Sequence, residues 1–264
     1  QQFRIAESVA GELRARILAS DGDYGFPTQD QLVTEFGVSY PSIREALRIL
    51  ETEGLVTVRR GKVGGAEVHR PDEISAAYHL GLALEARKVT LGDLAGALQL
   101  IEPMCVAECA TRPDRADTVV PALAANLDIS AALVGDGVAF TKAARQFHDM
   151  FVVFNPNATI RHVAGSLVAL WSAQEQTWAE VMARRGEYPS KDDATSAVRA
   201  HQRILDEIAG GNPAEAARIA RAHLAATQKL VLHRFEDGVV TVSSSWARQI
   251  TQVGGAALVA RREP

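Results

Sequence analysis

Three histidines lie where helical periodicity turns them inward in the C-terminal half of the chain. His201 and His223 each occupy the centre of an apolar stripe, and His148 borders another, on three separate predicted helices. Neutral imidazole is a common metal ligand, and a buried imidazole needs a partner for each ring nitrogen. The pattern therefore leaves two interpretations open: a divalent-metal site with three nitrogen ligands, or three core histidines that are hydrogen-bonded separately.

A cationic helix face near the N-terminus is the second group suited to chemistry. Arg44 and Arg48 fall opposite an apolar stripe, which consists of Ile43, Ala46, Leu47 and Leu50. An exposed arginine near the start of a helix can bind guanine in the major groove of DNA. Three further cations follow the helix and suit phosphates or the adjacent minor groove, namely Arg59, Arg60 and Lys62.

The elements that would position these cations are three short helices and a hairpin. We expect helices over residues 5–19, from a Thr28 cap to Phe36, and from a Ser39 cap to about Glu53. Residues 55–58 and 66–69 are predicted strands, joined by the glycine-rich turn 61–65. This order predicts a winged helix-turn-helix with a small β-hairpin.

The histidines belong to a region with almost continuous helical periodicity. Its predicted helices cover residues 73–87, 91–111, 114–134, 138–154, 157–184, 190–210 and 213–236. The protein is therefore expected to be mainly α, with an antiparallel all-α bundle of about seven helices after the winged domain. The expected domains are residues 1–72 for DNA binding and 73–236 for effector binding and dimerisation, with 237–264 as a C-terminal tail.

Overall composition does not indicate a nucleic-acid-binding protein. The 264 residues hold 28 Lys and Arg against 32 Asp and Glu, a net charge of −4. Positive charge gathers locally, because residues 36–70 hold six basic and four acidic residues whereas residues 1–35 hold three and six. No run is apolar enough for a membrane helix or a secretory signal, and the two cysteines cannot form a disulfide framework. We expect a cytoplasmic protein with no membrane partner.

The stretch from Phe26 to Val68 closely resembles the GntR family of bacterial transcription regulators. The resemblance is carried by FPTQDQLVTEFGV, SYPSIREALRIL, ETEGLVTVRR and GKVGGAEV. It implies that the third helix enters the major groove of double-stranded DNA and that the wing also touches DNA. Arg44 matches the family's principal DNA-contacting arginine. The implied DNA-binding residues are Thr28, Ser39, Tyr40, Ser42, Arg44, Arg48, Arg59, Arg60, Lys62 and Gly64.

Two positions depart from the GntR pattern. Tyr40 stands where the family usually has arginine, and Asp30 stands where it usually has a basic residue in the second helix. A tyrosine hydroxyl can still donate to a phosphate. We therefore expect an altered operator preference or weaker non-specific binding, and not a loss of DNA binding.

Residues 75–235 resemble the ligand-binding FCD domain of the FadR subfamily. The resemblance is carried by HQRILDEIAGGNPAEAARIARAHL at 201–224 and by RQFH at 145–148. It implies a divalent metal, zinc or nickel, bound by His148, His201 and His223, which holds a carboxylate effector. Some members of the subfamily instead bind acyl ligands without metal. Glu102, Ala144 and Trp171 are the expected effector-pocket residues.

Two departures bear on this pocket. Ala144 replaces the aspartate that usually completes the metal site, so the site loses its anionic ligand. Gln99 stands where the family often has an arginine, so one cationic anchor for the effector is missing. Three neutral imidazoles with an open position can still coordinate zinc. Without the aspartate, the site keeps more net positive charge, which attracts an anionic effector.

These features together predict a ligand-responsive transcription regulator and not an enzyme. We expect a homodimeric repressor whose affinity for its operator is changed by a small carboxylate of the fatty-acid or hydroxy-acid type. The alternatives are a metal-dependent hydrolase, since an open position on a metal can activate water, and a helical bundle used only as a scaffold. Against the hydrolase, position 144 holds alanine and no general base.

Overall fold

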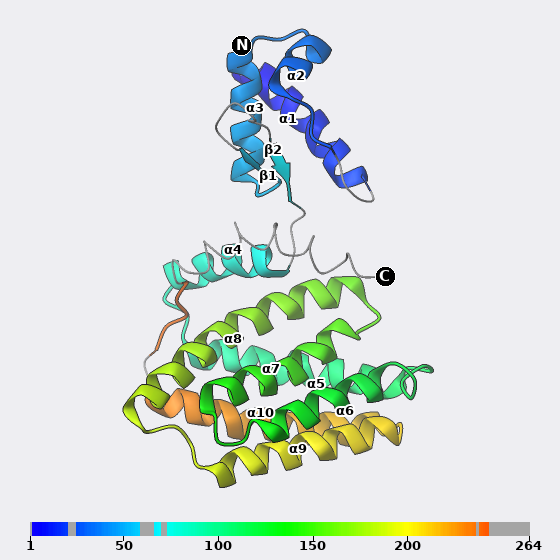
Figure 1. Ribbon diagram of the computed structural model, residues 1–264, viewed down its shortest axis with the longest axis vertical. Coiled ribbons are helices and arrows are strands. Elements are labelled where there is room, and N and C mark those ends of the chain that lie inside the picture. The colour runs from blue at the N-terminus through cyan, green and yellow to red at the C-terminus, as the bar shows by residue number, and fades with distance from the viewer. Residues whose placement is uncertain (1, 21–24, 59–65, 70–72, 236–237, 243–264) are drawn as a thin grey trace. The chain divides into compact units, whose positions relative to one another are not determined.

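The computed structural model describes residues 2–20, 25–58, 66–69, 73–235 and 238–242. Within these ranges the chain forms two compact units that divide after Ser75 (Figure 1). The first unit carries the small hairpin, and the second is built from helices. The mainly α fold expected from the sequence is confirmed.

The first unit is a winged helix-turn-helix. Its elements are α1 (Gln2–Ala19), α2 (Gln29–Phe36), α3 (Tyr40–Thr52), β1 (Val56–Val58) and β2 (Ala66–Val68). The two strands pair antiparallel, with Val56 opposite Val68 and Val58 opposite Ala66. α3 packs against both α1 and α2 and continues into β1, so one small core supports the helix and the base of the wing.

Local signals in the sequence determine where the short helices begin and end. The Thr28 side chain accepts from the Gln31 backbone N–H, and the Gln31 side chain accepts from the Thr28 N–H in return. Gly37 ends α2 with φ 62°, a conformation that glycine adopts without a steric penalty. α3 turns Ile43, Leu47 and Leu50 into the core, which leaves its other face exposed.

The second unit is an antiparallel bundle of helices (Figure 1). Its helices are α4 (Glu73–Ala86), α5 (Leu91–Thr111), α6 (Val119–Ala132), α7 (Gly137–Val153), α8 (Ala158–Arg185), α9 (Lys191–Ala209) and α10 (Pro213–Arg234). α5 and α10 pack along each other, α10 also packs on α9, and α7 lies against α6, α8 and α9. Among the described helices, none is both long and apolar enough to cross a bilayer.

One predicted helix starts later than expected. Periodicity predicts a helix from residue 114, but α6 begins at Val119. Residues 113–118 form turns instead, in which the Thr118 N–H bonds to the Asp114 carbonyl. The Asp114 carboxylate pairs with Arg112, so it stays with the end of α5 and does not cap a new helix.

A short piece of the tail packs on the bundle. Val239 forms an isolated antiparallel bridge with Thr90, supported by bonds from Leu91 N to Gly238 O at 2.8 Å and from Val240 N to Val89 O at 2.9 Å. Gly81 in α4 leaves room for Val242, because a Cβ there would lie 2.5 Å from that side chain. The segment 238–242 is therefore part of the folded unit, whereas residues 243–264 lie outside the described chain.

The two cysteines should be unreactive in the folded protein. Cys105 and Cys109 are fully buried in α5, and burial raises the pKa of Cys105 to about 11 and that of Cys109 to about 12. The thiolate is the reactive form, so both thiols stay protonated at pH 8. We expect an aromatic disulfide reagent to titrate neither thiol in the native protein and both in denaturant. Rapid titration of either thiol without denaturant would contradict this packing.

Candidate functional site

Three buried imidazoles meet in the middle of the bundle. His148 comes from α7, His201 from α9 and His223 from α10. The Nε2 atom of His201 lies 3.1 Å from Nε2 of His148 and 2.9 Å from Nε2 of His223. One nitrogen from each ring therefore points at a common centre, and all three side chains are at least nine-tenths buried.

A fourth helix orients the first of these rings. Nδ1 of His148 donates to the carboxylate of Glu102 on α5, which is fully buried. Burial alone would raise the pKa of Glu102, but His148, through its charge and hydrogen bond, and the Arg145 guanidinium hold it below its usual value. An ionised Glu102 keeps a proton on Nδ1, which leaves Nε2 as the nitrogen of His148 that is directed at the centre.

The other two rings are held neutral. Burial, followed by the neighbouring imidazoles, lowers the pKa of His201 well below 6.5. Burial also lowers the pKa of His223, to about 3. Both rings therefore keep a lone pair available over the physiological pH range.

The three ring nitrogens cannot all be satisfied by hydrogen bonds among themselves, whereas a bound cation would satisfy them. A neutral imidazole carries one N–H, and His148 already uses its own toward Glu102. Nε2 of His201 faces Nε2 of both His148 and His223. If it carries a proton, it can donate to His148. If it carries a lone pair, it can only accept from His223. With neutral rings, one of the two contacts always lacks a matching proton. A metal ion bound by three lone pairs removes this conflict.

The donor set also fits a divalent metal in type and spacing. Zinc–nitrogen bonds are about 2.0–2.1 Å, so nitrogens on a tetrahedral ion are roughly 3.3 Å apart. The Nε2–Nε2 distances of 2.9 and 3.1 Å in the structure are close to that value. The contact from His148 to Glu102 matches the carboxylate–histidine pairs that support metal sites.

A buried arginine lies beside the histidines. Arg145 of α7 places Nη2 3.7 Å from Glu102 and Nε 3.6 Å from Glu175, too far for good hydrogen bonds. Those two nitrogens have no hydrogen-bond partner within the described residues. Burial opposes its charge, but Glu102 and Glu175 raise the pKa of Arg145, so it remains a cation. The guanidinium is thus held near two carboxylates, and its Nε and Nη2 donors make no hydrogen bond within the described residues.

These groups line a pocket of about 80 Å³ that is partly open to solvent, and it is called the histidine cavity below. It is lined by the three histidines, Arg145, Glu175, Ala144 and Trp178, together with Phe140, Thr141, Tyr188, Pro189, Asp193, Ala194, Ala197, Thr227 and Leu230. Ala144 sits where an aspartate would otherwise occupy space beside His148. Burial raises the pKa of Glu175, so this carboxyl is easier to protonate than its neighbour Glu102.

Two predicted pocket residues lie behind the cavity wall. Glu102 does not line the cavity and acts on it through His148 and Arg145. Trp171 is fully buried and donates from Nε1 to Glu175 at 3.1 Å, so it supports a cavity residue from behind, and its own contact with an effector stays a prediction. Gln99 bonds to Gln228 and not to the cavity groups. Sequence reasoning missed Arg145 and Glu175, because nothing in a helical pattern shows that a charged side chain is buried.

The exposed face of α3 is the candidate DNA-binding surface. Arg44 and Arg48 are both exposed, and Arg48 makes only a long contact of 3.4 Å with Glu45. Ser42 is 3% exposed and its hydroxyl lies 3.1 Å from the Ser39 hydroxyl, so its role as a DNA contact stays a prediction. Ser42 falls on the core side of the helix, next to Ile43.

The two departures from the GntR pattern are in contact with each other. The Tyr40 hydroxyl donates to Asp30 at 2.8 Å, and this bond raises the pKa of the tyrosine. The hydroxyl must leave Asp30 before it can donate to a phosphate. Thr28 and Ser39 are exposed beside them, although Thr28 already caps α2. The predicted wing residues Arg59, Arg60, Lys62 and Gly64 lie outside the described residues.

Family models match both units of the chain. The model described as bacterial regulatory proteins, gntR family, matches residues 5–64. The model for the FCD domain matches residues 93–226, about half of the chain. The first range contains α3, and the second contains the histidines and Arg145.

Two curated bacterial proteins are similar over most of the chain. The HTH-type transcriptional regulator LutR of Bacillus subtilis is 24% identical, over 79% of this chain and 91% of its own length. The HTH-type transcriptional repressor NanR of Citrobacter rodentium is 25% identical, over 84% of this chain and 83% of its own length. Among solved structures, Streptococcus agalactiae GntR matches 85% of this chain and 99% of its own, with a TM-score of 0.62 and 21% identity. This last likeness concerns the fold.

Replacing Glu102 should weaken metal binding without removing a ligand. Glu102→Gln keeps the shape but loses the charge that keeps the His148 proton on Nδ1, and such changes typically cost 10–100-fold in metal affinity. Zinc affinity is measured by competition with a chromophoric chelator. Glu108→Gln, an exposed change on the same helix, is the matched control and should leave affinity unchanged. Equal affinity in the Glu102 variant and the wild type would contradict the orienting role.

Proposed function

The chain belongs to the GntR family of bacterial regulators that carry an FCD domain, and we propose that it is a repressor controlled by a small carboxylate. Proteins of this family are DNA-binding, ligand-responsive transcription regulators and not enzymes. Hydrolysis at the histidines and a purely scaffolding bundle are therefore set aside. A repressor, rather than an activator, is supported by the name of the similar NanR protein.

The observation that carries the proposal is the convergence of three buried imidazoles and one buried cation on a single cavity. His148, His201 and His223 would hold a divalent ion, zinc or nickel, by their Nε2 atoms. Such an ion supplies positive charge and an open coordination position. Because Ala144 brings no anion, that charge stays available to a ligand.

Arg145 gives the cavity its preference for a carboxylate. Its fork of N–H groups matches the two oxygens of a carboxylate, and two of its nitrogens are otherwise without hydrogen bonds. Glu102 lies 3.7 Å from Nη2 and Glu175 lies 3.6 Å from Nε, and Arg145 is also one of the residues that line the cavity. A fatty acid or hydroxy acid would therefore bind with its carboxylate between the histidine centre and Arg145.

DNA binding is assigned to α3 and the wing of the first unit. Arg44 is exposed near the start of α3, where side chains reach base edges in the major groove. A homodimer with two-fold symmetry would place two such helices on the half-sites of a near-palindromic operator. The effector would change operator affinity because it binds the DNA-competent and DNA-incompetent states with different strengths.

Replacing Arg44 tests the DNA-binding face. Arg44→Ala removes a bidentate base contact and should cost about 1–3 kcal/mol on an operator selected from random sequence, with a smaller loss on unrelated DNA. Fluorescence anisotropy at fixed salt measures both affinities. Arg221→Ala, an exposed change on α10, is the control and should have no effect. Unchanged specific binding in the Arg44 variant would mean that another surface reads the operator.

Replacing Arg145 tests the effector site. We expect a carboxylate from a panel of fatty and hydroxy acids to lower operator affinity at least fivefold in the zinc-loaded wild type, a typical allosteric coupling. Arg145→Met should abolish that response, and Arg145→Lys should retain part of it. Circular dichroism establishes that each variant is folded. A panel acid that bound the wild type without changing operator affinity would contradict the proposed regulation.

A further inference from the structure

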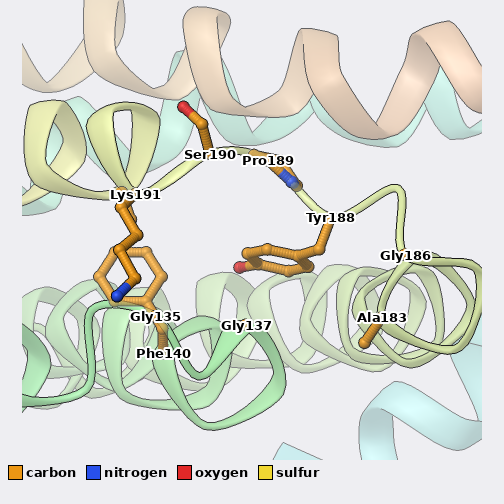
Figure 2. Close-up of a pocket in the computed structure, with 10 residues that line it drawn as sticks. Gly135, Gly137, Phe140, Ala183, Gly186, Tyr188, Pro189, Ser190 and Lys191 are labelled. Carbon is orange, nitrogen blue, oxygen red and sulfur yellow. The ribbon is translucent and has the colours of Figure 1, made fainter.

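A second hollow of about 310 Å³ lies next to the histidine cavity. Figure 2 shows the residues that line this second hollow. The hollow is formed where α7 begins, α8 ends and the connection 186–190 leads into α9. Four residues line both spaces: Phe140, Tyr188, Pro189 and Ala194. The two spaces therefore adjoin each other across a shared wall. The space of about 310 Å³ is called the outer hollow below, and the histidine cavity the inner cavity.

Glycines shape the floor of the outer hollow. A Cβ at Gly137 would lie 2.6 Å from the Tyr188 ring, so only glycine lets that ring lie against the start of α7. Gly135 has φ 112°, and a Cβ there would lie 2.9 Å from Cε of Lys191. Figure 2 shows the Lys191 side chain reaching past Phe140 toward Gly135. Both close approaches depend on the missing side chains.

Tyr188 is fixed as part of the shared wall. The Thr141 hydroxyl donates to the Gly137 carbonyl at 2.9 Å and lies 2.7 Å from the Tyr188 hydroxyl. Because the Thr141 hydroxyl proton is donated to the Gly137 carbonyl, the Tyr188 hydroxyl must be the donor in its contact with Thr141. The Tyr188 oxygen can therefore still accept a hydrogen bond. The ring also packs at 5.6 Å from Trp178, which lines the inner cavity. Tyr188 is thus one of the four residues of the wall between the two spaces, and it is held by this hydrogen bond and by packing on Trp178.

Charge distinguishes the outer hollow from an ordinary surface depression. Of the described residues that line it, Lys191 alone is charged, and it forms no salt bridge within the described chain. The nearby Asp193 is already occupied, because its carboxylate accepts from the Ser190 backbone N–H and hydroxyl. An anionic group in the hollow would meet one cation and no competing acid on the lining.

We propose that the outer hollow is a second subsite for the same effector, which is an elongated acid with an anionic group at each end. The inference rests on the proposed function, in which one carboxylate sits by the histidines and Arg145. The inner cavity of about 80 Å³ takes only the head of such a molecule. The rest passes Tyr188 into the apolar space beside Phe140, and the second anionic group pairs with Lys191.

Chain-length series of acids test the proposal on the full-length protein with one equivalent of zinc. Linear dicarboxylates from succinate to suberate are compared with monocarboxylates of the same length by isothermal titration calorimetry. At one chain length the diacid should bind about threefold to fivefold tighter than its monoacid, as an exposed ion pair allows. Lys191→Met should remove that preference. Lys142→Met, an exposed change on α7 outside both spaces, should keep it.

The outcomes distinguish failure of the outer subsite from failure of the proposed function. Equal binding of diacids and monoacids, or a preference that survives Lys191→Met, overturns the outer subsite while the monoacid binding still supports the proposed function. Absence of binding for both series overturns both. Tyr188→Phe adds an independent readout, because loss of the bond to Thr141 should raise the association rate of diacids, measured by stopped-flow, more than that of short monoacids.

Discussion

The bundle is organised around polar groups that it buries and must satisfy. Three imidazoles, a glutamate and an arginine lie among apolar side chains, where an unpaired polar group is costly. Glu102 serves both His148 and Arg145, so it neutralises the arginine and orients the first ring at the same time. Four helices, α5, α7, α9 and α10, contribute to the cluster, and their packing is therefore tied to its chemistry. A cation at the centre would bind the ring nitrogens that hydrogen bonds among neutral imidazoles cannot all satisfy.

Much of the fold follows from signals that lie close together in the sequence. Thr28 and Gln31, three residues apart, form the box that starts α2, and Gly37 ends it. The spacing of His148, His201 and His223 within apolar stripes places each ring on the inner face of its helix, as the structure shows. Resemblance to a known domain then brought those three rings together, which periodicity alone left undecided against three separate core histidines. Ala144 was recognisable from the same resemblance as a gap in the site.

The remaining features depend on contacts between elements that periodicity does not encode. Arg145 is an ordinary charged residue in the helical pattern, and its burial arises only because α5 and α8 supply Glu102 and Glu175 on either side. Tyr40 and Asp30 each depart from the family pattern, but only their position on adjoining helices shows that they bond to each other. Ser42 is a DNA-binding residue only by resemblance, and the structure shows that the helix turns its small side chain toward the core.

The most direct measurement of the central claim is X-ray absorption at the zinc edge on the full-length protein with one equivalent of metal. We expect three imidazole nitrogens at about 2.0–2.1 Å from the zinc and an oxygen in the remaining position. A bound carboxylate effector should change that oxygen shell and leave the three nitrogens in place. Fewer than three imidazoles, or an oxygen shell that is unaffected by an acid known to bind, would contradict a three-histidine centre that holds the effector.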